Sequence, residues 1–67
     1  MANRLLEWCD EHAATVTDLA DLTGYSVSYL SLIARGKREP TPLTKLAIAR
    51  ALGERVRELF PADRVAS

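Results

Sequence analysis

The sequence is poor in the side chains that cross-link small proteins. Its 67 residues include one cysteine, Cys9, and one histidine, His12. A single cysteine forms no internal disulfide, and these two residues fall short of the four ligands of a structural zinc site. We therefore expect no metal, no cofactor and a cytoplasmic location. A chain of this length buries only about 60% of the surface that its unfolded form exposes.

Long hydrophobic runs are missing, and so is any excess of one charge. The N-terminal stretch MANRLLEWCDEH has too short an apolar run and too many charged residues for a signal peptide or a membrane span. We therefore expect no membrane contact. Nine basic and nine acidic side chains give zero net charge. At first sight this counts against nucleic-acid binding, because nucleic-acid-binding domains are usually basic.

Patterns of catalytic residues are absent as well. The sequence has no nucleophile paired with a base, no glycine-rich phosphate loop and no pair of carboxylates at a catalytic spacing. We therefore expect that the chain is not an enzyme.

Only three glycines occur, and they divide the chain into segments with helical patterning. Gly24, Gly36 and Gly53 each end a segment, and no segment has the alternation of a strand. Thr15 with Asp18 three residues later resembles a capping box. We predict one all-α domain over residues 1–67, a compact five-helix bundle with helices at approximately 2–13, 16–23, 27–35, 42–52 and 55–60 and a tail at 61–67.

The second and third predicted helices are joined by a minimal turn, Gly24-Tyr25-Ser26. A turn this tight makes the two helices cross steeply and leaves the outer face of 27–35 exposed. An exposed helix fits a DNA major groove, which is about 12 Å wide. From spacing alone two interpretations stay open: a DNA-binding helix-turn-helix, or a helical corner without a role in nucleic-acid binding.

Several short motifs follow one another around and after this turn. They are Leu19-Ala20, the run TGYSVSYLSLI from Thr23 to Ile33, the run RGKREPT from Arg35 to Thr41, and then IARALG at 48–53 and ELF at 58–60. Their order and spacing resemble the Cro and phage-repressor (XRE-type) helix-turn-helix family over residues 15 to 60. The resemblance implies a lambda-repressor-like DNA-binding fold and double-stranded DNA as the partner.

The resemblance also implies which residues contact DNA. In that family the third helix lies in the major groove with its N-terminal outward side chains against base edges. The base-reading residues expected here are Val27, Ser28, Tyr29, Ser31 and Leu32. The phosphate contacts expected are the first amides of the second helix and the basic residues after the third, namely Thr15, Val16, Thr17, Arg35, Lys37 and Arg38.

Two residues depart from the family pattern. Val16 stands where a glutamine is usual, and Cys9 where an arginine is common in the first helix. Two expected phosphate contacts are therefore missing, which weakens the case for tight binding by a monomer.

The fourth predicted helix, 42–52, is apolar nearly all round. Such a helix is either buried on several sides or carries a surface for a partner. Our candidate surface for a weak homodimer or a protein partner consists of Leu43, Leu46, Ala47, Leu59 and Phe60. A dimer would place two recognition helices about 34 Å apart, on successive major grooves.

The remaining notable side chains favour structural interpretations. We expect Trp8 in the core or at its rim and Cys9 as a small buried side chain. The acidic residues are expected to form a solvated face that points away from DNA: Asp10, Glu11, Asp18 and Asp21.

The leading functional hypothesis is a sequence-specific DNA-binding transcriptional regulator, a small Cro-like or repressor-like protein of phage or prophage type. One alternative is a protein-interaction module, such as an anti-repressor or an antitoxin, which the zero net charge and the apolar Val27 and Leu32 favour. A second alternative is an excisionase-like accessory protein that bends the duplex.

Overall fold

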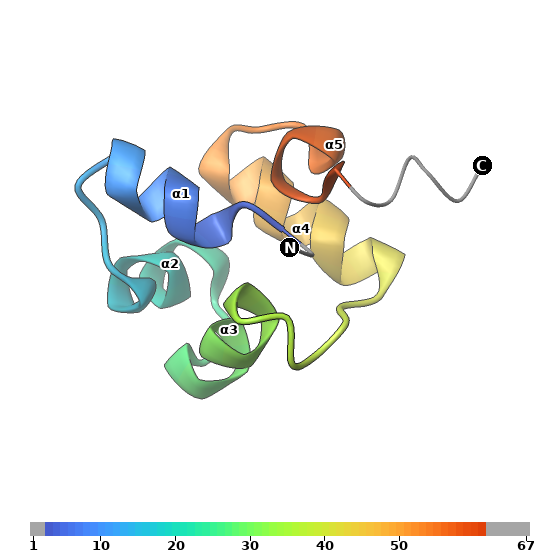
Figure 1. Cartoon of the computed structure of the whole chain (residues 1–67), viewed down its shortest axis with the longest axis horizontal. Coiled ribbons are helices and arrows are strands. Elements are labelled where there is room, and N and C mark those ends of the chain that lie inside the picture. Colours follow the sequence, from blue (N-terminus) through green and yellow to red (C-terminus); the bar gives the residue numbers. More distant parts are fainter. Residues whose placement is uncertain (1–2, 62–67) are drawn as a thin grey trace.

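The computed structural model describes residues 3–61, which form five α-helices and no strand. This confirms the predicted all-α, five-helix fold (Figure 1). The helices are α1 (Leu5–Glu11), α2 (Val16–Thr23), α3 (Val27–Ala34), α4 (Pro42–Leu52) and α5 (Val56–Leu59). Apart from Pro61, the predicted tail lies outside the described residues.

Helix α1 is shorter than the predicted range 2–13, whose first residue also lies outside the described part. Asn3 precedes the helix, and its Oδ1 accepts a hydrogen bond of 3.1 Å from the Leu5 amide. At the other end Ala13 has φ of 52°, a conformation that does not continue a right-handed helix. Both ends are therefore fixed by backbone geometry that the apolar spacing alone does not reveal.

The N-termini of the next three helices are capped by hydroxyl side chains. Thr15 and Asp18 form the predicted capping box, since the Asp18 amide donates to Thr15 Oγ1 at 3.2 Å and the Thr15 amide donates to Asp18 Oδ2 at 2.9 Å. Ser26 caps α3 and Thr41 caps α4. Each cap satisfies an amide that the first turn of a helix leaves without an intrahelical partner.

A single core joins the helices. Side chains from α1 to α4 are fully buried within it: Leu5, Leu19, Leu30, Ile33 and Ile48, each 0% exposed. Helix α2 packs against α3 and α4, and α4 packs against α5. Trp8 and Cys9 are buried here as expected. Burial raises the pKa of the Cys9 thiol, and the negative charge of Asp18 adds a smaller increase.

The C-terminal part of the core corrects one expectation. Leu59 and Phe60, which we predicted to lie on a partner surface, are each 2% exposed. The short helix α5 turns them inward against the other helices, so neither side chain is available to a partner of the folded chain. None of the helices within residues 3–61 has the length and apolarity of a membrane span.

Candidate nucleic-acid interface

The turn between α2 and α3 sets the direction of α3. Gly24 has φ of 82°, a left-handed conformation that costs glycine little. The Thr23 hydroxyl then accepts a 3.2 Å hydrogen bond from the Tyr25 amide and donates one of 2.8 Å to the Leu19 carbonyl. In Figure 1 α3 lies at the lower edge of the molecule, on the side away from α1 and α5.

Helix α3 has one buried face and one exposed face. Leu30 and Ile33 are fully buried, while Val27 is 42% and Leu32 37% exposed. Ser28 lies on the exposed side as well. Three of the five predicted base-reading residues therefore form a continuous outward surface on α3.

The other two predicted base-reading residues are half-buried. The Tyr29 ring packs 5.4 Å from the Tyr25 ring, and the Arg38 guanidinium carbon lies 5.3 Å from the Tyr29 ring centre. Ser31 lines a hollow of about 210 Å³ together with Val16 and Arg35. The fold thus places Ser31 beside two of the predicted phosphate-contacting residues rather than on the outermost face of α3.

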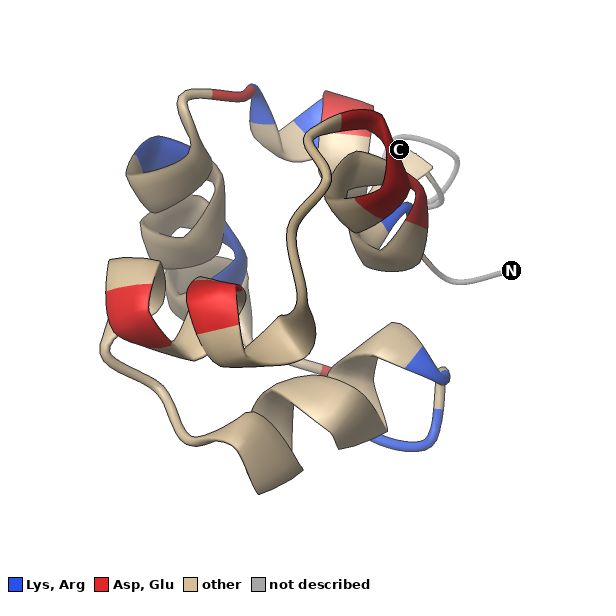
Figure 2. Cartoon of the chain, turned by 90° about the vertical axis from the view of Figure 1, so that its left-hand side faces the viewer, with Lys and Arg blue, Asp and Glu red and all other residues tan. Residues whose placement is uncertain are grey.

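The loop after α3 folds back along the end of the helix. The Lys37 amide donates to the Leu32 carbonyl at 2.9 Å and the Gly36 amide to the Ile33 carbonyl at 3.0 Å, which is the hydrogen-bond pattern of a Schellman motif. Gly36 has φ of 75°, the left-handed conformation that this motif requires. Arg35, Lys37 and Arg38 are all exposed beside α3 as a result (Figure 2, blue loop at the bottom).

We predict that Gly36→Ala weakens DNA binding on all sequences alike and lowers the free energy of unfolding by about 1–2 kcal/mol, the cost of a left-handed conformation with a Cβ. Gly36→Asn is the matched control, since asparagine tolerates this conformation far better. Titration of a duplex with both variants, alongside urea unfolding, checks the prediction. Equal effects of the two substitutions would contradict it.

The single acidic residue of the loop is paired. Glu39 Oε2 lies 2.7 Å from Lys45 Nζ, and the Lys45 ammonium also lies 5.6 Å from the centre of the Phe60 ring. Lys45 is buried on α4. The ion pair compensates the negative charge of Glu39, and the other three charged residues of the loop, Arg35, Lys37 and Arg38, are basic. The sequence interpretation missed Lys45, because its position on an apolar helix does not show that it faces inward.

The N-terminus of α2 corrects a second expectation. The Thr15 amide already donates to the Asp18 carboxylate, so it is not available to a phosphate. Within residues 3–61 the Val16 and Thr17 amides have no acceptor, because they belong to the first turn. Two of the three predicted amide donors therefore remain, next to a carboxylate that repels phosphate.

Asn3 is a positioning residue that the sequence interpretation also missed. Its Nδ2 donates a 2.7 Å hydrogen bond to the Ile33 carbonyl near the C-terminal end of α3, and Asn3 is only 5% exposed. The nearby Arg4 amide donates to the Leu59 carbonyl at 2.7 Å. The start of the chain therefore fixes the end of α3 from which the basic loop begins.

The rest of the predicted partner surface lies on α4. Leu43 is 76% and Leu46 41% exposed, and Ala47 is exposed next to them. The described residues contain no cluster of three or more histidine, cysteine or carboxylate side chains that would hold a metal ion.

Two helices joined by a short turn, an exposed face on the second helix and a basic loop beside it define a DNA-binding helix-turn-helix domain. The chain belongs to the helix-turn-helix family HTH_3, which matches residues 10–59, more than half of its length. This family comprises DNA-binding regulators of the XRE type, which confirms the resemblance found in the sequence. No curated protein and no solved structure matches the chain.

Proposed function

We propose that the chain is a sequence-specific transcriptional regulator, of the small Cro-like or repressor-like kind found in phages and prophages, acting on DNA in the cytoplasm. The observation that carries the proposal is the exposure of Val27, Ser28 and Leu32 on α3, directly beside a basic loop. No catalytic step is part of the proposed function.

Each exposed side chain of α3 has a distinct role in this proposal. The Ser28 hydroxyl donates to or accepts from a base edge, and Val27 and Leu32 pack on thymine methyl groups. Few bidentate hydrogen bonds are available to such a surface, so part of the specificity comes from the shape of the DNA.

The phosphate contacts come from the loop and from α2. Arg35, Lys37 and Arg38 neutralise phosphates and release counterions, which gives affinity for any sequence. The Val16 and Thr17 amides supply weaker contacts at the N-terminus of α2. We assign Tyr29 to the support of Arg38, because its half-buried ring lies 5.3 Å from that guanidinium.

Selection of bound sites from a random duplex library tests the assignment of the reading face. Ser28→Ala and Leu32→Ala are expected to change which bases are preferred, at about 1–3 kcal/mol for a lost specific contact. Leu22→Ala is the control, since Leu22 is 53% exposed on α2 and outside the proposed face. If the wild-type chain selects no site and instead retains a protein from solution, the interaction-module alternative replaces the proposal.

We further propose a weak homodimer through α4. Leu43, Leu46 and Ala47 stand at the three- and four-residue spacing that forms one helix stripe, and all three are exposed. Leu43→Glu is expected to shift a monomer–dimer equilibrium fully to monomer in sedimentation, whereas Leu22→Glu on α2 leaves it unchanged. A wild-type chain that stays monomeric on a palindromic duplex would rule out this dimer.

A further inference from the structure

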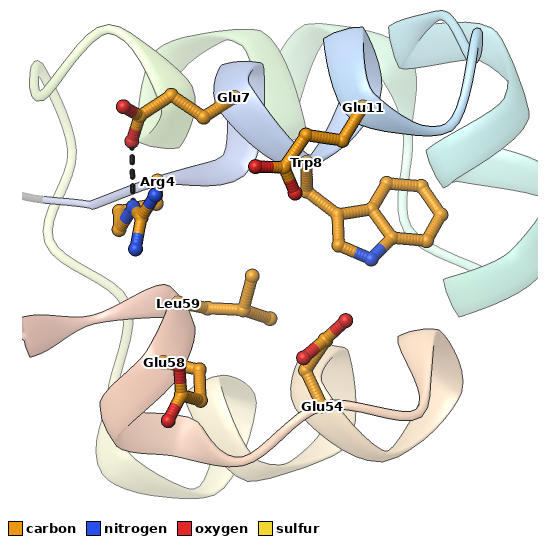
Figure 3. A pocket seen from close by; sticks show the side chains of 7 residues that line it. All are labelled: Arg4, Glu7, Trp8, Glu11, Glu54, Glu58 and Leu59. Atoms are coloured by element: carbon orange, nitrogen blue, oxygen red, sulfur yellow. Dashed lines mark hydrogen bonds and ion pairs between the residues drawn. The ribbon is translucent and has the colours of Figure 1, made fainter.

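A second recess lies between α1 and the C-terminal part of the chain, away from α3. It has a volume of about 220 Å³ and is lined by four glutamates with Arg4 and Trp8. Figure 3 shows Glu7 and Glu11 entering from α1, and Glu54 and Glu58 from the opposite side. We call it the α1–α5 recess.

The recess carries excess negative charge. Arg4 Nε donates to Glu7 Oε1 at 2.8 Å, so this pair is neutral. Within residues 3–61 the other three glutamates, Glu11, Glu54 and Glu58, form no ion pair. The pKa of Arg4 is raised, mainly by its hydrogen bond with Glu7 and to a smaller extent by the negative charges of Glu7, Glu11 and Glu58. The single basic group of the recess therefore stays protonated.

The wall of the recess contains an unsatisfied hydrogen-bond donor. Trp8 is 8% exposed, and its buried Nε1 has no acceptor among the described residues. In Figure 3 this nitrogen points toward the side of the recess from which Glu54 enters. The His12 ring stacks on the indole with 4.1 Å between ring centres, which holds the indole in place. Buried donors are nearly always paired, so a missing acceptor marks a place for a ligand atom.

The size of the recess decides among ligand types. Its 220 Å³ falls below the range of about 300–1,000 Å³ typical of small-molecule pockets, so one inserted side chain fits better than a cofactor. The described residues form no metal-binding cluster. The negative charge of the recess favours a cationic ligand, and the unpaired Trp8 Nε1 needs a hydrogen-bond acceptor from that ligand.

We propose that the α1–α5 recess binds an arginine side chain of a partner protein. The guanidinium group has five donors in a fixed plane, which suits several carboxylates better than the single ammonium of lysine. It lies between Glu11, Glu54 and Glu58, and the backbone carbonyl of the same arginine accepts from Trp8 Nε1. Arginine recognition here goes beyond DNA binding and does not depend on it.

The position of the recess allows both partners to bind together. In Figure 1 α1 and α5 lie at the upper edge and α3 at the lower edge, and Figure 2 shows the acidic residues of α1 and the basic loop at opposite ends of the same view. A protein held by α1 and α5 therefore does not cover the DNA-binding face.

The experiment uses the fact that Trp8 is the one tryptophan of the chain, so a proton–nitrogen NMR spectrum has one indole signal. The probe is the peptide acetyl-Gly-Arg-Gly-amide, and its control is the same peptide with citrulline, a neutral isostere of arginine. We expect a saturable shift of the indole proton to lower field with the arginine peptide alone, at constant ionic strength. The same shift is expected when the protein is bound to duplex DNA.

Charge-neutralising variants localise the binding. Glu54→Gln and Glu11→Gln are each expected to raise the Kd of the arginine peptide about two- to fivefold, the range for a partly exposed ion pair. Asp10→Asn, on the same helix but outside the recess, and Asp21→Asn on α2 are the controls and leave Kd unchanged. An unmoved indole signal, equal shifts with both peptides, or equal effects of all four variants would overturn the proposal. None of these outcomes depends on whether α3 reads DNA.

Discussion

Replacing Arg35, Lys37 and Arg38 together by alanine is expected to weaken binding to every duplex, whatever its sequence. Each phosphate that a cation neutralises contributes about 0.9 to the slope of log K against log salt concentration, so three contacts contribute about 2.7. All three side chains are exposed beside α3, and the nearby carboxylate of Glu39 is paired with Lys45. The variant should therefore lose most of its salt dependence. Titration of a labelled duplex at several salt concentrations measures the slope.

The matched control removes three other exposed arginines, Arg50, Arg55 and Arg57, which lie at the end of α4 and around α5. Both triple variants change the net charge from zero to −3, since each loses three of the nine basic residues that balance nine acidic ones. A general electrostatic effect would weaken binding equally in the two variants. Equal losses would contradict the assignment of the loop to the phosphate backbone, whereas a loss confined to the loop variant supports it.

The largest expected effect on stability comes from Leu30→Ala. Leu30 is fully buried on the inner face of α3, and truncation of a buried leucine costs about 2–5 kcal/mol. A core of this size rarely supplies more than about 3–5 kcal/mol in total. We therefore expect the variant to be largely unfolded in the absence of DNA, which urea or thermal unfolding followed by circular dichroism will show.

Leu43→Ala is the control for this substitution, because Leu43 is 76% exposed. Its effect on unfolding of the monomer should stay within about 0.5 kcal/mol, as for most surface substitutions. A Leu30→Ala variant as stable as the Leu43→Ala variant would show that the core does not depend on the inner face of α3.

Features that arise within a few residues were predictable from the sequence. The capping box of Thr15 and Asp18 formed as expected, and the predicted ranges for α2 and α4 agree with the structure. Leu30 and Ile33 face the core, and Val27 and Leu32 face outward, as the helical period requires. A cap or a helical face depends on neighbours three or four residues away, and these neighbours can be identified from the sequence alone.

Features that require two distant segments to meet were not predictable in the same way. The spacing of Leu59 and Phe60 fits a surface or a core equally well, and only the position of α5 against the other helices decides that they are buried. The hydrogen bond from Asn3 to the Ile33 carbonyl joins residues 30 positions apart. No local pattern encodes such a contact.

The sequence by itself therefore determined the number of helices, the bounds of α2 and α4, the capping box of α2, the outward face of α3 and the family. The tertiary structure alone decided that Lys45 points inward to neutralise Glu39, that Asp18 occupies the Thr15 amide, and that glutamates from α1 and from the region of α5 surround one tryptophan. The physical reason is the separation along the sequence over which each interaction acts. Helical periodicity and capping act between near neighbours, whereas burial and charge clustering depend on which faces the folded chain brings together.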